Sequence, residues 1–164
     1  MNNNTINFHD VYMIELDRYD PRVDKEAIKE LFEDFIENIA HFSSDWEKFE
    51  AELNKRVLDL QYRNSIVIAR EEGKIVGMGT FTIFRDYLGN DRVLIHQVMT
   101  RKADSYKKGI EELVITEVQK YVKRALKIEK FYFICPDSDG NMRSLLLKLN
   151  QKKTKFPWYE NQPI

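Results

Sequence analysis

Residues 92–126, RVLIHQVMTRKADSYKKGIEELVITEVQKYVKRAL, decide how this chain is expected to fold. Their first nine residues predict a buried strand, which leads into a basic loop with a single glycine, Gly109. An amphipathic helix is expected after the loop, because apolar residues then recur at helical spacing. These residues are Ile110, Leu113, Val114, Val118, Tyr121, Val122 and Ala125. A helix N-terminus reached through such a turn presents backbone N–H groups to one point, which suits a phosphate.

The composition predicts one compact domain. The chain has 164 residues, of which 43% are hydrophobic. We therefore expect a single domain over residues 11–164, preceded by a loose, asparagine-rich arm at 1–10. The 26 basic and 27 acidic residues give a formal net charge of -1, so neither nucleic acid nor a membrane surface is an expected partner.

The N-terminal sequence and the cysteine content favour the cytoplasm. The first residues are polar and lack the basic and apolar regions of a signal peptide, and no apolar run approaches the length of a membrane span. Cys135 is the only cysteine, which excludes an internal disulfide and fits a reducing compartment. Because it ends an apolar strand, Cys135 is expected to be a small core residue rather than a nucleophile.

Upstream of the central stretch, the sequence predicts a strand and two helices. The strand covers residues 11–16, and Asp24 can cap a helix whose apolar residues recur at helical spacing up to Ile39. Ser44 and Glu47 form a capping box for the second helix. We expect that helix to bury Trp46, Phe49, Leu53, Val57 and Leu60, and to leave Glu47, Lys48, Glu50, Lys55 and Arg56 largely to solvent.

The residues that follow the second helix predict a β-hairpin. Residues 65–70 and 75–85 flank a glycine turn, and β-branched residues cluster on both sides of it. Gly77 and Gly79 lie inside the second arm. Glycines within a strand indicate a bulge or the close approach of another part of the chain.

Downstream of the central helix, the chain has room for three more elements. Residues 130–135 predict a strand, and a strand, helix, strand order of this length implies a parallel, right-handed crossover. Asn141 can begin a short helix, and a single strand fits around residues 154–159. Aromatic surface and an open sheet edge at 156–159 would favour a homodimer, unless the aromatic residues fold back onto the chain's own core.

This order of elements resembles the GCN5-related N-acetyltransferases over nearly the whole chain. The most specific local match is residues 66–77, IVIAREEGKIVG, which are similar to the second and third strands of that family. The resemblance implies an α/β (α+β) fold with a mixed, mostly antiparallel sheet and about four helices. A splayed pair of parallel strands is expected at the centre of the sheet, and the C-terminal strands are expected to be shortened.

The resemblance also implies acetyl-CoA as co-substrate and no metal. In the family, the pyrophosphate is held by a loop of the form Arg/Gln-x-x-Gly-x-Gly/Ala, and the corresponding run here is residues 106–111, YKKGIE. Lys107 and Lys108 could supply charge, and Gly109 lets its backbone N–H approach a phosphate. The resemblance further implies coenzyme contacts from Met99 and Thr100 through their backbone N–H groups, from Ile110 and from Asn141.

Glu111 is the largest departure from the family's loop, since a glycine or alanine is usual at its position. A glutamate there would crowd the pyrophosphate, and at ~4 Å it would repel a phosphate by ~1 kcal/mol in water. Coenzyme binding then requires that Glu111 turns away. The alternative is that Glu111 and Glu112 only favour the first turn of a helix, where carboxylates interact well with the helix dipole.

The chemistry implied by the resemblance is direct attack of a primary amine on the acetyl thioester. An alkyl amine has a pKa of ~10.4, so a general base is the first group to look for. The family often has a glutamate on the central strand, and the nearest residue here is Gln97, which cannot take a proton. His96 is adjacent, and it is either a base or a core residue with satisfied hydrogen bonds. Neighbours on a strand face opposite sides, so at most one of the two lines the cleft.

Two hypotheses for function follow. His41 and Phe42 lie between the first two helices, where the family meets its acceptor, although His41 can equally be an ordinary helix-end residue. The leading hypothesis is an acyl-CoA-dependent N-acyltransferase that transfers acetyl to the amine of a small molecule or a peptide. The alternative is a catalytically inactive binding or dimerisation module, which is favoured by Gln97, by Glu111 and by the lack of a tyrosine for general acid on the short helix.

Overall fold

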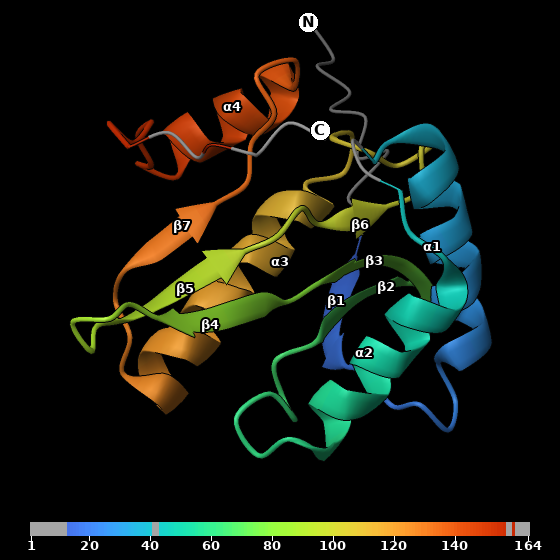
Figure 1. The fold of residues 1–164 in the computed structure, drawn as a ribbon. Coiled ribbons are helices and arrows are strands. Elements are labelled where there is room, and N and C mark those ends of the chain that lie inside the picture. The colour runs from blue at the N-terminus through green and yellow to red at the C-terminus, as the bar shows by residue number, and fades with distance from the viewer. Residues whose placement is uncertain (1–12, 41–42, 157–158, 160–164) are drawn as a thin grey trace, which may run out of the picture. The chain divides into compact units, whose positions relative to one another are not determined.

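The computed structural model describes residues 13–40, 43–156 and 159. The chain divides into two compact units, Met1–Ile134 and Cys135–Ile164. Within the described residues, the first unit contains seven strands, three α-helices and a short π-helix, and the second unit contains one α-helix (Figure 1). The expected α/β class is therefore confirmed. The single domain expected over residues 11–164 stays a prediction.

The first elements follow the predicted order. They are the strand β1 (Ile14–Arg18) and the helices α1 (Lys25–Asn38) and α2 (Trp46–Leu58). Asp24 precedes α1, but its carboxylate pairs with Arg70 at 2.8 Å instead of capping the helix. The cap of α2 is Asp45, whose Oδ1 accepts a hydrogen bond from the Lys48 N–H at 2.9 Å. The capping box predicted at Ser44 is wrong, because a carboxylate one position nearer the helix supplies the acceptor.

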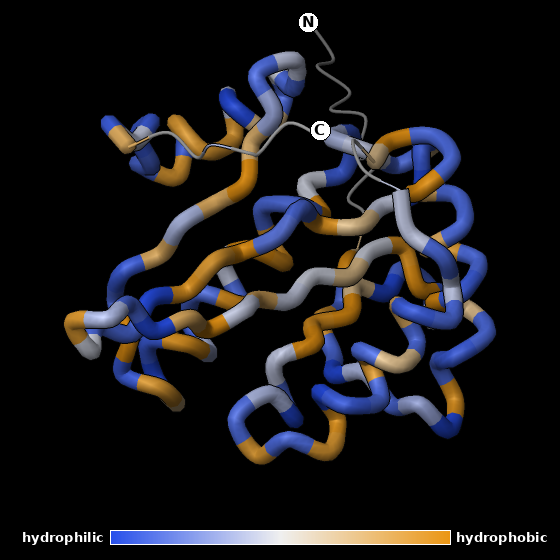
Figure 2. Tube along the Cα trace, viewed as in Figure 1, coloured by the Kyte–Doolittle hydropathy of each residue, from blue (hydrophilic) through white to orange (hydrophobic). Residues whose placement is uncertain are grey.

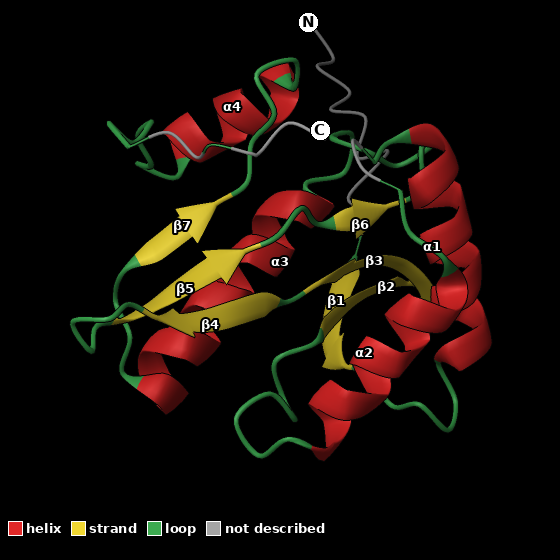
Figure 3. Ribbon diagram, in the orientation of Figure 1, coloured by secondary structure: helices red, strands yellow, loops and turns green. Residues whose placement is uncertain are grey.

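Two sheets organise the first unit (Figure 3). Their further strands are β2 (Val67–Glu71), β3 (Lys74–Gly79), β4 (Phe81–Arg85), β5 (Asp91–Ile95), β6 (Met99–Thr100) and β7 (Phe131–Phe133). One sheet has the order β1-β2-β3-β6, and the other has the order β4-β5-β7. All neighbouring strands are antiparallel except β5 and β7, which form the parallel pair that the sequence predicts.

Both long strands predicted from the sequence are broken. The predicted strand 75–85 divides at Thr80 into β3 and β4, and the predicted strand 92–100 divides at 96–98 into β5 and β6. Each strand thereby crosses from one sheet to the other. The breaks face each other, because Met78 pairs with Met99 on one side of them and Phe81 pairs with Ile95 on the other. Residues 79–80 thus oppose residues 96–98, as in a β-bulge. Hydrophobic periodicity does not reveal this mismatch between the strands.

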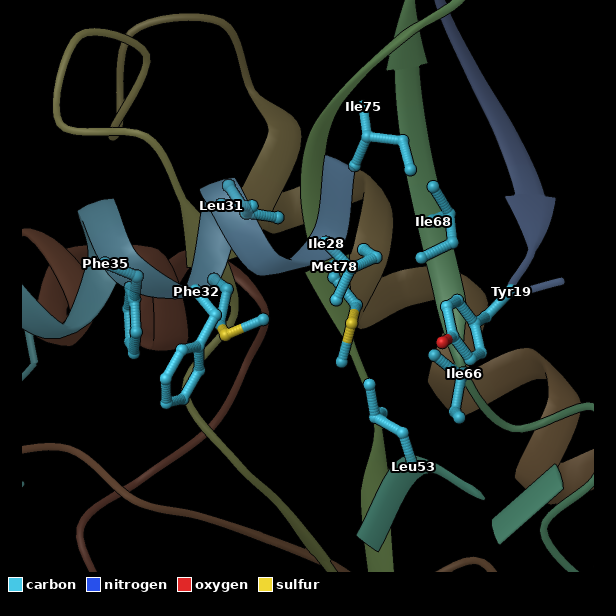
Figure 4. Packing of buried hydrophobic residues seen from close by; sticks show 11 residues of the cluster. Tyr19, Ile28, Leu31, Phe32, Phe35, Leu53, Ile66, Ile68, Ile75 and Met78 are labelled. Carbon is cyan, nitrogen blue, oxygen red and sulfur yellow. The ribbon is translucent and has the colours of Figure 1, made fainter. Parts of the chain in front are cut away.

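Helices pack on both faces of the four-stranded sheet. On one face, α1 and α2 share with the strands a cluster of 11 buried residues (Figure 4). On the other face lies α3 (Ile110–Tyr121), for which Gly77 and Gly79 make room. A Cβ added at Gly77 would lie 2.5 Å from Cγ2 of Ile110, and one at Gly79 would meet Cγ1 of Val114. The close approach that the two glycines predict is therefore confirmed.

Three residues predicted as buried are exposed. Leu60 is 81% exposed, because α2 ends at Leu58. Leu113 is 40% exposed, since the buried stripe of α3 recurs every four residues from Ile110. Ala125 is exposed in the π-helical turn η1 (Val122–Leu126) that continues α3. Apolar and polar residues otherwise alternate as expected, for example along α1 in Figure 2.

The second unit contains α4 (Gly140–Lys148), so the short helix predicted from Asn141 is confirmed. Asp139 caps it by accepting a hydrogen bond from the Met142 N–H at 2.9 Å. Residues 154–156 are not part of a strand, and 157–158 lie outside the described residues. Phe156 and Tyr159 are 83% and 92% exposed, so these two rings are not folded into a core. The homodimer stays a prediction.

Among the described residues, no helix combines the length and the apolar character that crossing a bilayer requires.

Candidate functional site

The pairing of the two parallel strands ends at Ile95. Up to that point β5 and β7 are in register, with Val93 opposite Phe131 and Ile95 opposite Phe133. The Ile134 N–H makes the last contact, donating to the Ile95 carbonyl at 3.4 Å. Beyond the bulge, β6 pairs with β3 instead. Because β6 ends its sheet, one of its edges has no strand partner within the described chain.

Gly109 forms the turn into α3. It occupies the N-cap position with φ 72°, in the left-handed region that glycine adopts without strain. No atom lies within 4 Å of a Cβ added there, so the space beside the turn is open. The N–H groups of Gly109, Ile110 and Glu111 lack partners within the helix, as in the first turn of any α-helix. Among the described residues, no loop or turn carbonyl accepts from them.

Glu111 is folded into the loop behind this turn. The residue is 2% exposed, and its Oε1 accepts hydrogen bonds from the Tyr106 N–H at 2.9 Å and from the Thr100 hydroxyl at 3.2 Å. Its Oε2 is buried and has no hydrogen-bond partner among the described residues. The side chain thus fills the interior of the loop, as coenzyme binding would require, although it still uses one backbone donor of the loop.

Part of the positive charge of the loop is neutralised by carboxylates of the protein itself. Lys108 Nζ lies 2.7 Å from Glu71 and 3.1 Å from Asp104, and these hydrogen bonds raise the pKa of Lys108. Arg101 pairs with the same Asp104 at 2.8 Å. Lys107 is exposed, and its side chain forms no ion pair with any described residue. Lys107, unlike Lys108, therefore keeps a charge that no described carboxylate neutralises.

His96 and Gln97 lie in the bulge between β5 and β6, and both are half-buried. Because this segment is not a regular strand, the expected alternation of the two side chains does not apply to it. His96 Nε2 lies 2.8 Å from the Thr82 hydroxyl. Burial first, and then the charge of Arg56, lower the pKa of the imidazole below its ordinary value, which favours the neutral form.

Arg56 is a residue of this region that the sequence analysis missed. We expected it in solvent, but it is 8% exposed, and it donates hydrogen bonds to Thr82 at 2.9 Å, to Thr80 at 3.2 Å and to the Phe81 carbonyl. It therefore holds the break between β3 and β4. The sequence did contain a signal for its burial, because Arg56 lies three residues after Leu53, on the apolar stripe of α2.

The remaining predicted residues lie in the second unit or outside the described residues, and their part in the site stays a prediction. Asn141 is exposed in the first turn of α4, in the second unit. His41 and Phe42 lie outside the described residues. Cys135 is half-buried and lies after the end of β7, so the prediction of a core residue at a strand end is wrong; burial still raises the pKa of its thiol. The described residues hold no group of three or more His, Cys, Asp or Glu side chains that could bind a metal ion.

A cavity of about 540 Å³ lies elsewhere, at the connection between β1 and α1. Arginines line it, but three of the four are already paired within the protein. The pairs are Arg18 with Glu117, Arg22 with Asp20 and Arg70 with Asp24. This cavity therefore offers little free positive charge.

No protein-family model matches the chain, and no curated protein matches it. Solved structures do match. The aminoglycoside N-acetyltransferase AAC(6')-Iy in complex with CoA is similar with a TM-score of 0.71 and 10% identity, over 95% of this chain and 99% of that chain. The ribosomal-protein-alanine N-acetyltransferase from Brucella melitensis biovar Abortus 2308 has a TM-score of 0.67 and 16% identity, over 92% and 99%. A transcriptional regulator from Bacillus halodurans C-125 has a TM-score of 0.67 and 14% identity, over 92% and 100%.

The architecture is that of an α/β protein with a parallel strand pair, β5 and β7, and a helix, α3, that begins at a glycine turn. This is the fold of the GCN5-related N-acetyltransferases, in a divergent form. The resemblance seen in the sequence is thus confirmed at the level of the fold.

Proposed function

We propose that this chain is an acyl-CoA-dependent N-acyltransferase that transfers acetyl from acetyl-CoA to a primary amine by direct attack. The observation that carries the proposal is the start of α3. Gly109 is left-handed with open space beside it, and the N–H groups that follow it are unpartnered within the helix. A diphosphate is the natural ligand of such a turn.

The described residues suggest how the co-substrate would bind. Gly109 and Ile110 would donate backbone N–H groups to the pyrophosphate, and Lys107 would supply a charge. Lys108 and Glu111 would hold the shape of the loop from inside, through Glu71 and the Tyr106 N–H. The thioester carbonyl would accept from the backbone of Met99 or Thr100, because the open edge of an outer strand carries unpaired N–H groups.

The similar structures support the choice of acetyl as the transferred group and of an amine as its acceptor. Two of the similar structures are named as N-acetyltransferases, one acting on aminoglycosides and one on a ribosomal protein. A small molecule and a peptide N-terminus are therefore both reasonable acceptors. Asn141, His41 and Phe42 stay proposed contacts of the coenzyme and of the acceptor.

A second candidate is a binding module without catalysis. Two observations favour it, since Glu111 already uses a backbone donor of the loop and Gln97 cannot take a proton. One similar structure is named as a transcriptional regulator.

Calorimetric titration with acetyl-CoA tests the leading proposal. We expect binding, and at 100 times the dissociation constant a stabilisation of ~2.7 kcal/mol. Gly109→Val should abolish it, because a β-branched residue is strained in the left-handed region and covers the turn. Gly89→Val is the matched control, since Gly89 has φ 84° and open space in the turn between β4 and β5. Absence of heat at high micromolar acetyl-CoA would contradict the proposal. Binding without turnover of any amine would favour the second candidate.

A further inference from the structure

A hydrogen-bonded chain of three side chains connects α2 to the bulge. Arg56 Nη2 donates to the Thr82 hydroxyl oxygen at 2.9 Å, and the same oxygen lies 2.8 Å from His96 Nε2. Arg56 belongs to α2, Thr82 belongs to β4, and His96 is the first residue after β5. These three side chains therefore come together at the place where the two strands cross from one sheet to the other.

The protons of this chain can be assigned from its chemistry. A guanidinium only donates, so the Thr82 oxygen is the acceptor of the first hydrogen bond. A hydroxyl carries one proton, and His96 Nε2 is the only acceptor within hydrogen-bond distance of Thr82 among the described side chains. The arrangement that satisfies all three groups has Thr82 donating to Nε2. This arrangement has the imidazole proton on Nδ1, whereas the opposite tautomer would leave the threonine proton without this partner.

Burial first, and then the charge of Arg56, lower the pKa of His96 and favour the neutral ring. Arg56 is the charged group that acts on it, and this guanidinium is held in place by Glu52 at 2.8 Å and by the Tyr62 ring at 4.8 Å. Among the described residues, no carboxylate contacts His96, and no group hydrogen-bonds to Nδ1. The ring thus has an occupied acceptor, Nε2, and an available donor, Nδ1.

We propose that Arg56 and Thr82 are positioning residues that hold His96 as the Nδ1–H tautomer, and that His96 acts as a hydrogen-bond donor rather than as a general base. This inference rests on the proposed acyl transfer. As the amine nitrogen bonds to the carbonyl carbon, the carbonyl electron pair moves to oxygen, and Nδ1–H would stabilise that charge. Collapse breaks the carbon–sulfur bond and releases the thiolate. The proton lost from nitrogen passes to water.

Nitrogen-15 NMR of the imidazoles decides the tautomer without any assay of activity. The chain has three histidines, and the signals lost in His96→Asn identify those of His96. We expect a protonated Nδ1 and an unprotonated Nε2 at pH 8. Thr82→Val should abolish this preference, whereas Thr80→Val should keep it, because Thr80 contacts Arg56 but not His96. A protonated Nε2 in the unaltered protein, or equal spectra for the two variants, would overturn the proposal.

Activity then separates a donor from a base. The amide nitrogen of asparagine is separated from Cα by as many bonds as Nδ1 of histidine is. The amide nitrogen of glutamine corresponds in the same way to Nε2. We expect His96→Asn to keep most of the turnover and His96→Ala to lose ~100- to 1,000-fold, the usual effect of removing one oxyanion donor. Equal losses in His96→Asn and His96→Ala would overturn the donor role. So would an ionisation in the pH profile of kcat/KM that His96→Asn removes. Failure to bind acetyl-CoA would remove the proposed function and the donor role, while the NMR result on the tautomer would stand by itself.

Discussion

The carboxylate of Glu111 accepts a hydrogen bond from the backbone N–H of Tyr106 at 2.9 Å. This contact joins the first turn of α3 to the loop before it, and Tyr106 itself has φ 56°. A residue that looked from the sequence like an obstacle to a phosphate is thus part of the support of the turn.

The first prediction concerns Glu111. We expect Glu111→Ala to lower the free energy of unfolding by about 1–3 kcal/mol, because it removes the acceptor of the buried Thr100 hydroxyl and of the half-buried Tyr106 N–H. Glu111→Gln should cost less, since its amide oxygen can still accept from Tyr106, and it should tighten acetyl-CoA binding by removing a negative charge. Urea denaturation and calorimetry measure the two effects. Glu112→Gln is the matched control for charge in the same turn, and equal results for residues 111 and 112 would contradict this role.

The second prediction separates two neighbouring lysines. Lys107→Met should weaken acetyl-CoA binding and reduce its salt dependence, with little change in the midpoint of thermal unfolding, because Lys107 is exposed. Lys108→Met should lower that midpoint, because it leaves Glu71 and Asp104 without their shared cation. Calorimetry at two salt concentrations and a thermal melt distinguish them. The opposite assignment of the two effects would show that Lys108 leaves its partners to bind the phosphate.

The third prediction concerns the contact between β3 and α3. Gly77→Ala should destabilise the fold by about 1–3 kcal/mol through overpacking, because its Cβ would lie 2.5 Å from Cγ2 of Ile110. It should also weaken acetyl-CoA binding, since Ile110 is the first residue of α3. Adding Ile110→Leu, which lacks this branch, should restore part of the stability. A Gly77→Ala protein as stable as the Gly140→Ala control would contradict this packing, because a Cβ at Gly140 meets no atom within 4 Å.

The fourth prediction concerns pH. The pKa of His96 is lower in the folded protein than its ordinary value of 6.5, so the unfolded chain binds its proton first as the pH falls. The stability contributed by neutral His96 is therefore complete above pH 6.5 and declines as the pH falls from 6.5 toward the folded pKa. The slope is at most ~1.4 kcal/mol per pH unit. Urea denaturation between pH 8 and pH 5 measures it. His96→Asn should remove this part of the slope, and an unchanged slope would assign it to other groups.

Local sequence determined the kind and the order of the elements. The helices at α1 and α3 and the pair β2 and β3 follow from hydrophobic period and from glycine turns, which act between residues close in the chain. The glycine turn before α3 also followed from sequence, because Gly109 is the single glycine of that basic loop, whereas its left-handed conformation is seen only in the structure. The parallel relation of β5 and β7 followed from the length of the connection between them.

The tertiary structure alone decided which side chains meet at the site. The breaks at Thr80 and at residues 96–98 depend on a mismatch of one residue between two strands, which neither strand shows by itself. Arg56 is buried because polar partners from β4 surround it, and Glu111 turns inward because the Tyr106 N–H and the Thr100 hydroxyl lie behind it. A hydrogen bond between distant segments has no periodicity in the sequence. The chemistry of this protein therefore depends on contacts that only folding creates.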